Sequence, residues 1–505
     1  MVNFFKSNKG IVLILVLLFC SVLPFFYLNQ GTFLIDTGRE LYISQQVANG
    51  EVLYKDVLNI YGPFAYQFTA ILFNIFGESI NIVYNAGVIN SLIIVITLFL
   101  LAREFLNKRL SLSIAILSMF SLVFTTHLFN SNLPYSFGLS YALSSLLLSM
   151  LFLVKYLKSP SLKYACLSSF FAGLSVVNKY EFLLYPIVLL FAFSKPLSIK
   201  EKSLTFLFFM MMPIICFASL FLTGLTLIDF KNAISTMIKL GTSDNIKFFY
   251  SNYGNIYEQS AYQTLLKQSP LITILGFLPI ANILLFFSKI KDIIKNKPML
   301  VFSIATILAS AKFTLFMNVR HMGAFIFPLC LIMFLALIQN SKVKEQIKYI
   351  FIAFLIFVFV CYDVNSVNKR NYLLKTPKGN IKTTLQVGLP LYSALDYILK
   401  NTKNTDKIFT APEGTFINFI TDRKSENLHH NLVPLYYNDT FGEDEVMSAF
   451  SANSMDYILI FPTDMTEYGS KYFCDYAVRF CEMIDNDYIL VEQVDEVKIY
   501  KRKNK

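Results

Sequence analysis

The feature that most constrains this chain is a series of long apolar runs, each close to the length that crosses a lipid bilayer. A transmembrane helix needs about 20 consecutive, mostly apolar residues. We expect about eleven such helices, over residues 11–29, 82–102, 110–127, 135–154, 162–177, 181–194, 203–223, 269–288, 299–316, 321–339 and 348–363. Charged residues make up only 15% of the chain, whereas about 25% is usual in soluble domains. The sequence therefore predicts a polytopic α-helical membrane protein.

Basic residues indicate how these helices are oriented. Lys and Arg concentrate in short loops between alternate runs, such as 103–109 and 289–297. Loops of this kind face the cytoplasm in most membrane proteins. We therefore expect a multi-pass protein of the plasma membrane, with a cytoplasmic N-terminus and an extracytoplasmic C-terminal region. The same distribution accounts for the net charge of +11, so membrane lipids are expected as partners and nucleic acid is not.

Two parts of this topology have alternative interpretations. The first apolar run follows Lys6 and Lys9 as a signal peptide would, but no small-residue cleavage site comes after it. We interpret it as an uncleaved first helix. The runs at 162–177 and 181–194 are short and are separated only by NKYE. They form either two crossings or a hairpin that does not fully emerge.

The C-terminal region has the composition of a small soluble domain. Helical patterns at 391–402 and 471–484 alternate with strand patterns at 407–412, 456–462, 488–493 and 497–502. This alternation predicts an α/β domain. We divide the chain into a transmembrane domain at 1–364, with an outer loop at 30–81, and an extracytoplasmic domain at 365–505. Cys474 and Cys481 would lie about 10 Å apart on one helix, so no disulfide is expected between them.

The outer loop contains the strongest candidate for chemistry. Residues 33–64 are too polar for a membrane helix, and we expect interfacial helices at 41–49 and 61–77. Asp36 lies just past the first run, where partial burial would raise its pKa toward the value that suits a general base. The alternative is that Asp36 caps a helix that begins at Thr37. Glu40, one helical turn on, is positioned to share a substrate, a proton or a metal ion with Asp36.

Other charged residues are candidates for contact with an anionic lipid headgroup. Lys179 and Arg320 lie at the outer ends of apolar runs, and Arg is suited to bidentate contact with phosphate. Snorkelling toward the headgroups is the ordinary alternative for such a lysine. His321 is a base, a metal ligand or a simple interfacial residue, and no second histidine lies near it. Asp56 is more often a solvated loop residue.

Nucleotide-dependent chemistry has no support in the sequence. The chain contains no GxxxxGK[ST] loop, and no GxGxxG loop with a following acidic residue. It also lacks HExxH and GxSxG. These absences argue against nucleotide-driven transport and against a cytosolic nucleotide-sugar donor.

Several of these motifs together resemble the GT-C superfamily of membrane glycosyltransferases, and in particular its protein mannosyltransferase and aminoarabinose transferase group (glycosyltransferase family 39). The resemblance covers the acid after the first span, the turn at 54–57, Pro63 before an interfacial helix, and Phe76-Gly77. GLSVVNKYEF is similar to the family pattern that ends in lysine, which is Lys179 here. The stretch NVRHMGAFIFPL resembles the family segment in which a basic residue precedes a proline-containing span. The C-terminal stretch with Pro412, Glu413 and Gly414 resembles the outward domain of one bacterial branch.

This resemblance implies an inverting transfer of a sugar from a polyprenyl-phosphate carrier to a lipid, glycan or protein acceptor on the outer face of the membrane. Asp36 would be the catalytic base, with Glu40 as a second acid, and a divalent cation would bind these two if any metal is used. Lys179 and Arg320 would contact the phosphate of the carrier. Arg39, Asp56 and His321 are further candidates for contact with substrate. The chain has Asp36-Thr37 where the family often has Asp-Glu, and Gly62-Pro63 where it often has Pro-Pro. Glu413 either contacts substrate or caps a helix.

Two other classes of membrane protein fit part of the pattern. A flippase or transporter of lipid-linked glycans would place polar residues in mid-span and show inverted repeats, and no repeat is evident in this sequence. An O-antigen polymerase or ligase would have the same carrier and topology. We expect its main outer loop in the middle or late part of the chain, whereas the candidate acid here lies in the first outer loop.

Overall fold

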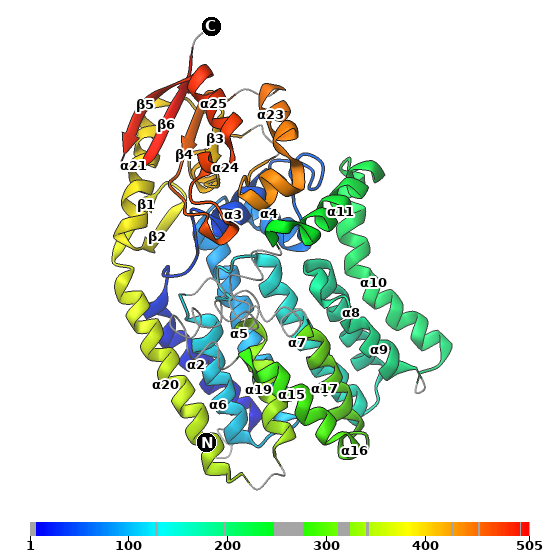
Figure 1. Cartoon of the computed structure of the whole chain (residues 1–505). Coiled ribbons are helices and arrows are strands. Elements are labelled where there is room, and N and C mark those ends of the chain that lie inside the picture. Colours follow the sequence, from blue (N-terminus) through cyan, green and yellow to red (C-terminus); the bar gives the residue numbers. More distant parts are fainter. Residues whose placement is uncertain are drawn as a thin grey trace.

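The computed structural model describes residues 7–126, 130–194, 197–246, 276–311, 324–339, 343–425, 429–452, 455–494 and 496–503 (Figure 1). Most of them are helical. The N-terminal part contains α2 (Asn8–Phe26), α3 (Asp36–Ala48), α4 (Phe64–Phe76), α5 (Ile80–Arg103), α6 (Lys108–Ser118), η1 (Met119–Val123), α7 (Phe137–Lys158), α8 (Leu162–Asn178), η2 (Tyr180–Phe182), α9 (Tyr185–Phe193), α10 (Ile199–Leu222) and α11 (Leu227–Thr242). It continues with α15 (Leu278–Ser288), α16 (Ile290–Ile293), α17 (Lys297–Ala309), α19 (Ala324–Leu337) and α20 (Glu345–Lys369).

The membrane-protein fold is confirmed, but the count of eleven spans is not. Among the described residues, five helices are long and apolar enough to cross a membrane, namely α2, α5, α7, α10 and α20. The shorter apolar helices within the described residues are Phe64–Phe76, Tyr180–Phe193, Leu278–Ser288, Lys297–Ala309 and Phe325–Leu337. The run at 110–127 shows one reason, because its helix α6 ends at Ser118 and continues only as the π-helical turn η1.

Apolar packing holds the bundle together. One buried cluster takes side chains from α2, α5, α6, α7, α17, α19 and α20, with Leu15, Phe99 and Leu146 fully buried. In contrast, only 17% of the apolar window of α10 and of α20 is buried. Large apolar side chains exposed on a membrane helix face the hydrocarbon, so α10 and α20 lie at the lipid-facing surface of the bundle.

The basic loops meet at one end of the bundle. Lys158 Nζ donates to Glu104 Oε2 at 2.9 Å, which joins the loops that follow α5 and α7. Asn107 Nδ2 donates to Glu345 Oε1 at 3.0 Å, which brings the start of α20 to the same place. The C-terminal domain lies at the opposite end (Figure 1).

The C-terminal domain has the predicted α/β character. Its elements are β1 (Tyr372–Thr376), β2 (Gly379–Thr383), α21 (Leu385–Asn401), β3 (Ile408–Ala411), α22 (Phe416–Thr421), η4 (Leu435–Phe441), α23 (Glu443–Ala452), β4 (Tyr457–Ile460), η5 (Thr466–Tyr468), α24 (Phe473–Tyr476), α25 (Val478–Asp487), β5 (Tyr488–Val494) and β6 (Val497–Arg502). The four predicted strands form one sheet of order β3-β4-β6-β5, in which β3 and β4 are parallel and the other pairs antiparallel. The β1-β2 hairpin was not predicted.

The expectation that Cys474 and Cys481 stay apart is wrong. They form a disulfide with a Cα–Cα distance of 5.8 Å. The expected single helix at 471–484 breaks at Ala477, whose φ of −100° and ψ of 54° are not helical, and the chain folds back there. The estimate of about 10 Å assumed an unbroken helix, so the break accounts for the difference.

The outer loop and the C-terminal domain pack as one body. A single buried cluster combines Leu41 and Tyr42 of α3 with Phe416 and Ile420 of α22. Contact is close at Gly38, where a Cβ would lie 2.7 Å from the Cβ of Phe416. Helix α3 is therefore held between the membrane bundle and the sheet, and residues at its ends can reach both parts (Figure 1).

Candidate functional site

Asp36 is the first residue of α3, and its side chain does not cap the helix. Ile35 occupies the capping position and makes no side-chain cap bond, so the alternative interpretation of Asp36 as a cap for a helix starting at Thr37 is wrong. Asp36 Oδ1 instead accepts a hydrogen bond from Arg39 Nη2 at 2.8 Å. A carboxylate in the first turn also interacts favourably with the helix dipole. The residue is thus free of a backbone-capping role.

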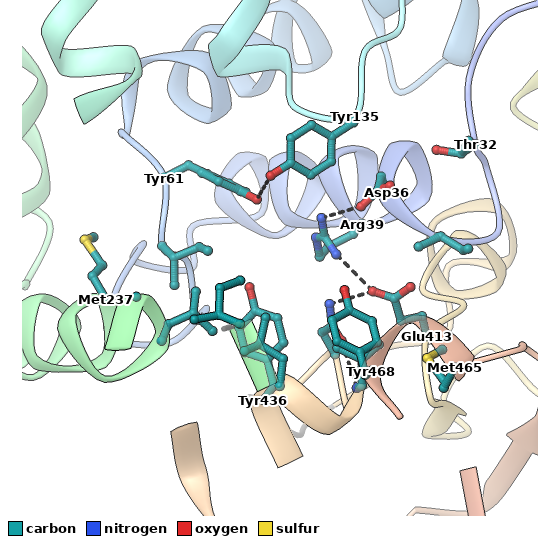
Figure 2. A pocket seen from close by; sticks show the side chains of 18 of the residues that line it. Thr32, Asp36, Arg39, Tyr61, Tyr135, Met237, Glu413, Tyr436, Met465 and Tyr468 are labelled. Carbon is teal, nitrogen blue, oxygen red and sulfur yellow. Dashed lines mark hydrogen bonds and ion pairs between the residues drawn. The ribbon is translucent and has the colours of Figure 1, made fainter. Parts of the chain in front are cut away.

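Asp36 opens onto a cavity of about 710 Å³ between the membrane bundle and the C-terminal domain (Figure 2). Arg39 and Lys179, two residues for which the sequence predicted substrate contact, line this cavity. Glu413 lines it too, from the loop after β3. The structure therefore brings Lys179 and Glu413, which lie far apart in the sequence, to the same cavity as Asp36 and Arg39.

Arg39 bridges the two parts of the protein inside this cavity. Besides the contact with Asp36, Arg39 Nη1 donates to Glu413 Oε1 at 3.1 Å. Asn431 Nδ2 donates to the same oxygen at 2.5 Å, which fixes the Glu413 carboxylate from its other side. Only 13% of the Arg39 side chain and 8% of that of Glu413 are exposed. Glu413 is thus an ion-pair partner at the cavity, and neither of the roles considered from the sequence included this contact.

The position of Asp36 perturbs its acidity. Burial raises the pKa of Asp36, because the low-polarity surroundings disfavour the charged form. The charge of Arg39 and its hydrogen bond oppose that rise. A carboxylate with a raised pKa is a stronger base than an ordinary surface aspartate.

Lys179 lies in an aromatic part of the same cavity. Its Nζ is 3.9 Å from the ring centre of Tyr61, and it approaches Glu181 Oε1 at 3.7 Å. The Tyr61 and Tyr135 hydroxyls share a hydrogen bond of 2.7 Å (Figure 2). Only 3% of the Lys179 side chain is exposed. This lysine therefore faces the site, and the snorkelling alternative is wrong.

Local geometry explains why Tyr61 reaches Lys179. Gly62 passes so close to the end of α8 that a Cβ there would lie 1.9 Å from the Val177 carbonyl oxygen. Only glycine permits this approach. Lys179 directly follows α8, so the loop carrying Tyr61 is held against it.

Glu40 does not share the cavity with Asp36. Its carboxylate is fully buried, accepts from the Tyr66 hydroxyl at 2.6 Å and from the Phe137 backbone N–H at 3.0 Å, and is absent from the cavity lining. The structure contradicts the expectation that Glu40 joins Asp36 in substrate or metal binding. The i, i+4 spacing permitted that arrangement, but Glu40 faces α4 and the start of α7.

Two further expectations differ from the structure or fall outside it. Asp56 Oδ2 accepts from the Val52 backbone N–H at 2.9 Å, so it stabilises its own turn and does not line the cavity. Arg320 and His321 lie outside the described residues.

A metal ion does not fit the residues that the structure describes. In these ranges no group of three His, Cys, Asp or Glu side chains lies close enough to hold one. The expected ligand pair, Asp36 and Glu40, contacts different partners. Arg39 provides the positive charge beside Asp36. We therefore derive no step through a metal.

The sequence analysis missed the aromatic and amide residues of the cavity. Tyr61, Tyr135, Asn431 and Tyr436 line it or contact its charged groups. The 29 tyrosines of the chain conceal the few that matter, because interfacial belts explain most tyrosines in membrane proteins. The one signal in the sequence for these cavity residues was that Tyr61 lies next to the Gly62-Pro63 turn.

Comparison with known proteins identifies the fold. Residues 61–221 match the family model of dolichyl-phosphate-mannose-protein mannosyltransferases. This segment is less than half of the chain, contains Lys179 and Tyr135, and contains neither Asp36 nor Glu413. A search of curated protein sequences finds no match.

Solved structures agree over nearly the whole chain. ArnT from Cupriavidus metallidurans in the apo state has a TM-score of 0.56 at 12% identity, covering 96% of this chain and 97% of ArnT. ArnT bound to undecaprenyl phosphate has a TM-score of 0.52 at 11% identity, covering 98% of both chains. The Archaeoglobus fulgidus oligosaccharyltransferase tethered with an acceptor peptide has a TM-score of 0.52 at 12% identity, covering 99% of this chain and 75% of the other. The resemblance to the GT-C superfamily is confirmed at the level of the fold.

Proposed function

We propose that this chain, which has the fold of GT-C enzymes, is an integral membrane glycosyltransferase. It moves a sugar from a polyprenyl-phosphate carrier to a lipid, glycan or protein acceptor on the extracytoplasmic face of the plasma membrane. The observation that supports this most strongly is the meeting of Asp36, Arg39 and Lys179 in one cavity at the end of the bundle that bears the C-terminal domain. ArnT, which has this fold, has been crystallised with undecaprenyl phosphate.

Asp36 is the proposed general base. As the acceptor oxygen forms a bond to the anomeric carbon, the bond from that carbon to the phosphate oxygen breaks and its electron pair leaves with the phosphate. Asp36 takes the proton of the acceptor hydroxyl. Attack opposite the leaving group inverts the anomeric centre. The raised pKa of Asp36 suits this transfer, because a stronger base removes the proton more readily.

Lys179 is the proposed contact for the carrier phosphate. Negative charge develops on the departing phosphate oxygen, and a fixed cation in a site with little water stabilises that charge. Lys179 is nearly buried and is held by Tyr61 and Glu181, so its charge needs little reorganisation. Arg39 is a second cation within the same cavity.

Two observations support the extracytoplasmic orientation. The Lys- and Arg-rich loops gather at the end of the bundle opposite the C-terminal domain, as expected if that end is cytoplasmic. The C-terminal domain contains the Cys474–Cys481 disulfide, and disulfides persist mainly in oxidising compartments outside the cytosol.

The decisive experiment is sugar transfer by the full chain in proteoliposomes. Membranes of a strain that lacks this chain supply the lipid-linked donor and acceptor, and comparison with the parent strain identifies the missing sugar. We expect Asp36→Asn to reduce turnover at least about 100-fold, the lower range of a positioned base. Asp396→Asn is the control, because Asp396 lies on α21 and pairs with the exposed Lys400. Normal turnover by a correctly inserted Asp36→Asn protein would refute the role of Asp36.

Product analysis separates transfer from translocation. A transferase releases free polyprenyl phosphate in proportion to the sugar transferred, whereas a flippase moves the intact carrier. A polymerase or ligase also cleaves the carrier but transfers a glycan chain. If carrier cleavage is absent while lipid-linked sugar crosses the bilayer, the transferase proposal is wrong.

A further inference from the structure

Helix α11 connects the lipid-facing surface of the bundle to the cavity. It follows α10 after a short turn, and Thr226 and Asp229 form a capping box that starts it. Figure 1 shows α11 at the end of α10 nearest the C-terminal domain, level with α3 and α4. Helix α11 is not one of the membrane-spanning helices, and the proposed reaction gives it no role.

One face of α11 is apolar and exposed. Leu227, Ile234 and Ile238 are exposed to 76%, 41% and 61%. Spacings of seven and four residues place these three side chains on one side of an α-helix. We call them the outer stripe. Within the described ranges no other element covers this stripe.

The opposite face of α11 packs inward. Ala233 is buried in a cluster that includes Tyr54 and Leu220, and Phe230 and Met237 pack against it. Met237 and Leu240 also line the cavity that contains Asp36. The same helix therefore has one side in the site and one side without a protein partner.

The end of α11 is attached to the C-terminal domain. The backbone N–H and the side-chain amide of Asn245 donate to the Asp439 carboxylate at 2.9 and 3.0 Å. Leu240 and Ile246 pack with the cluster of Val433 and Leu435 beside the cavity. A displacement of α11 would therefore also displace residues that line the cavity.

The features around the outer stripe indicate what covers it. The stripe continues the lipid-facing surface of α10, whose last residues Phe221 and Leu222 are exposed to 38% and 87%. Lys231 and Lys239 are exposed on the same helix. Apolar side chains flanked by lysines are the composition of a helix that lies in the interface of an anionic bilayer.

We propose that α11 is a membrane-interface helix whose outer stripe lies at the boundary between headgroups and acyl chains, and whose inner face forms a wall of the cavity. Lipid is the occupant that the continuity with α10 and the two lysines favour. The lipid surface thereby lies next to the cavity at Met237 and Leu240. The consequence that a lipid-linked donor enters past α11 rests on the proposed function, whereas the membrane contact itself does not.

A fluorescent probe on α11 tests the contact directly. The exposed cysteines Cys20 and Cys361 are replaced by alanine in the full chain, and the probe NBD is attached at Ile238→Cys. Asn232→Cys is the matched control, since Asn232 is exposed on another face of the same helix. The proteins are placed in nanodiscs of phosphatidylglycerol and phosphatidylethanolamine that contain spin-labelled lipid.

We expect the spin-labelled lipid to quench NBD at residue 238 at least threefold more strongly than at residue 232, and aqueous iodide to show the reverse order. Iodide quenching at residue 238 equal to that at 232 would overturn the proposal, because the stripe would then be in water. Protection of residue 238 from both quenchers would overturn it too, because a protein surface would then cover the stripe.

A kinetic test addresses the donor path. We expect Ile234→Ser with Ile238→Ser to raise the KM for the lipid-linked donor about tenfold while leaving kcat unchanged. If the carrier is not cleaved, the proposed function fails but the quenching result still decides the membrane contact. An unchanged donor KM in the protein with Ile234→Ser and Ile238→Ser would overturn the donor path.

Discussion

The ion pair between Arg39 and Glu413 provides the sharpest test of how the two parts of the protein are held together. The atoms Nη1 and Oε1 lie 3.1 Å apart with both side chains nearly buried. At an effective dielectric constant of about 20, two unit charges at this distance attract by about 5 kcal/mol. Desolvation of both groups offsets much of this attraction, so the net contribution of the pair is smaller.

Removal of one partner is expected to cost more than the pair contributes. Arg39→Met leaves the carboxylates of Asp36 and Glu413 in the cavity without their shared cation, and an uncompensated buried charge costs about 3–5 kcal/mol. Glu413→Gln keeps an acceptor for Asn431 and leaves Arg39 paired with Asp36, so we expect a smaller loss. The double variant should lose about 1–3 kcal/mol less than the sum of the singles, because the two residues interact directly.

Unfolding in mixed micelles, followed by tyrosine fluorescence, measures these differences. The chain has no tryptophan, so its 29 tyrosines supply the signal. Lys400→Met is the control, since the pair of Lys400 with Asp396 is exposed to solvent and should contribute little to stability. If Arg39→Met unfolds no more easily than Lys400→Met, or if the double variant is additive, the bridge does not hold the two parts together.

Three other perturbations have expected outcomes of their own. Glu40→Gln should lower the free energy of unfolding by about 1–3 kcal/mol, because its NH₂ group would face the Phe137 N–H donor, while transfer per folded molecule stays near normal. Burial lowers the pKa of His430 to about 3 and that of His429 to about 4. The stability that these neutral histidines contribute above the unfolded-state pKa of about 6.5 should therefore fall as the pH drops toward 4. Denaturation midpoints between pH 7 and 4 measure this fall, and His430→Gln should make the midpoints depend less on pH. Cys474→Ala with Cys481→Ala should destabilise the C-terminal domain by about 2–3 kcal/mol through loss of a short closed loop, and limited proteolysis reports it.

Each of these outcomes has a contrary result that decides against the reasoning. Loss of turnover by a stable Glu40→Gln protein would restore Glu40 to the chemistry. A flat stability profile in the parent protein between pH 7 and 4 would show that the two histidines are not held neutral by burial. Unchanged proteolysis after removal of both cysteines would show that the break at Ala477 is stable without the disulfide.

The sequence by itself determined the membrane-protein class, the charge asymmetry along the chain and the strands of the C-terminal domain, and it indicated the segment around Asp36 as a candidate site. These properties follow from composition and from short-range periodicity, which residues close in sequence express regardless of the rest of the fold. Lys179 was also identified, because its place at the end of an apolar run was visible in the sequence.

Only the tertiary structure decided which of the candidates meet. Asp36 and Glu40 are one turn apart, yet one faces the cavity and the other is bonded to Tyr66 and Phe137. Glu413 lies 374 residues from Arg39 in the sequence and still contacts it. Spacing along a helix limits the direction of a side chain, but packing against distant elements decides what that side chain meets.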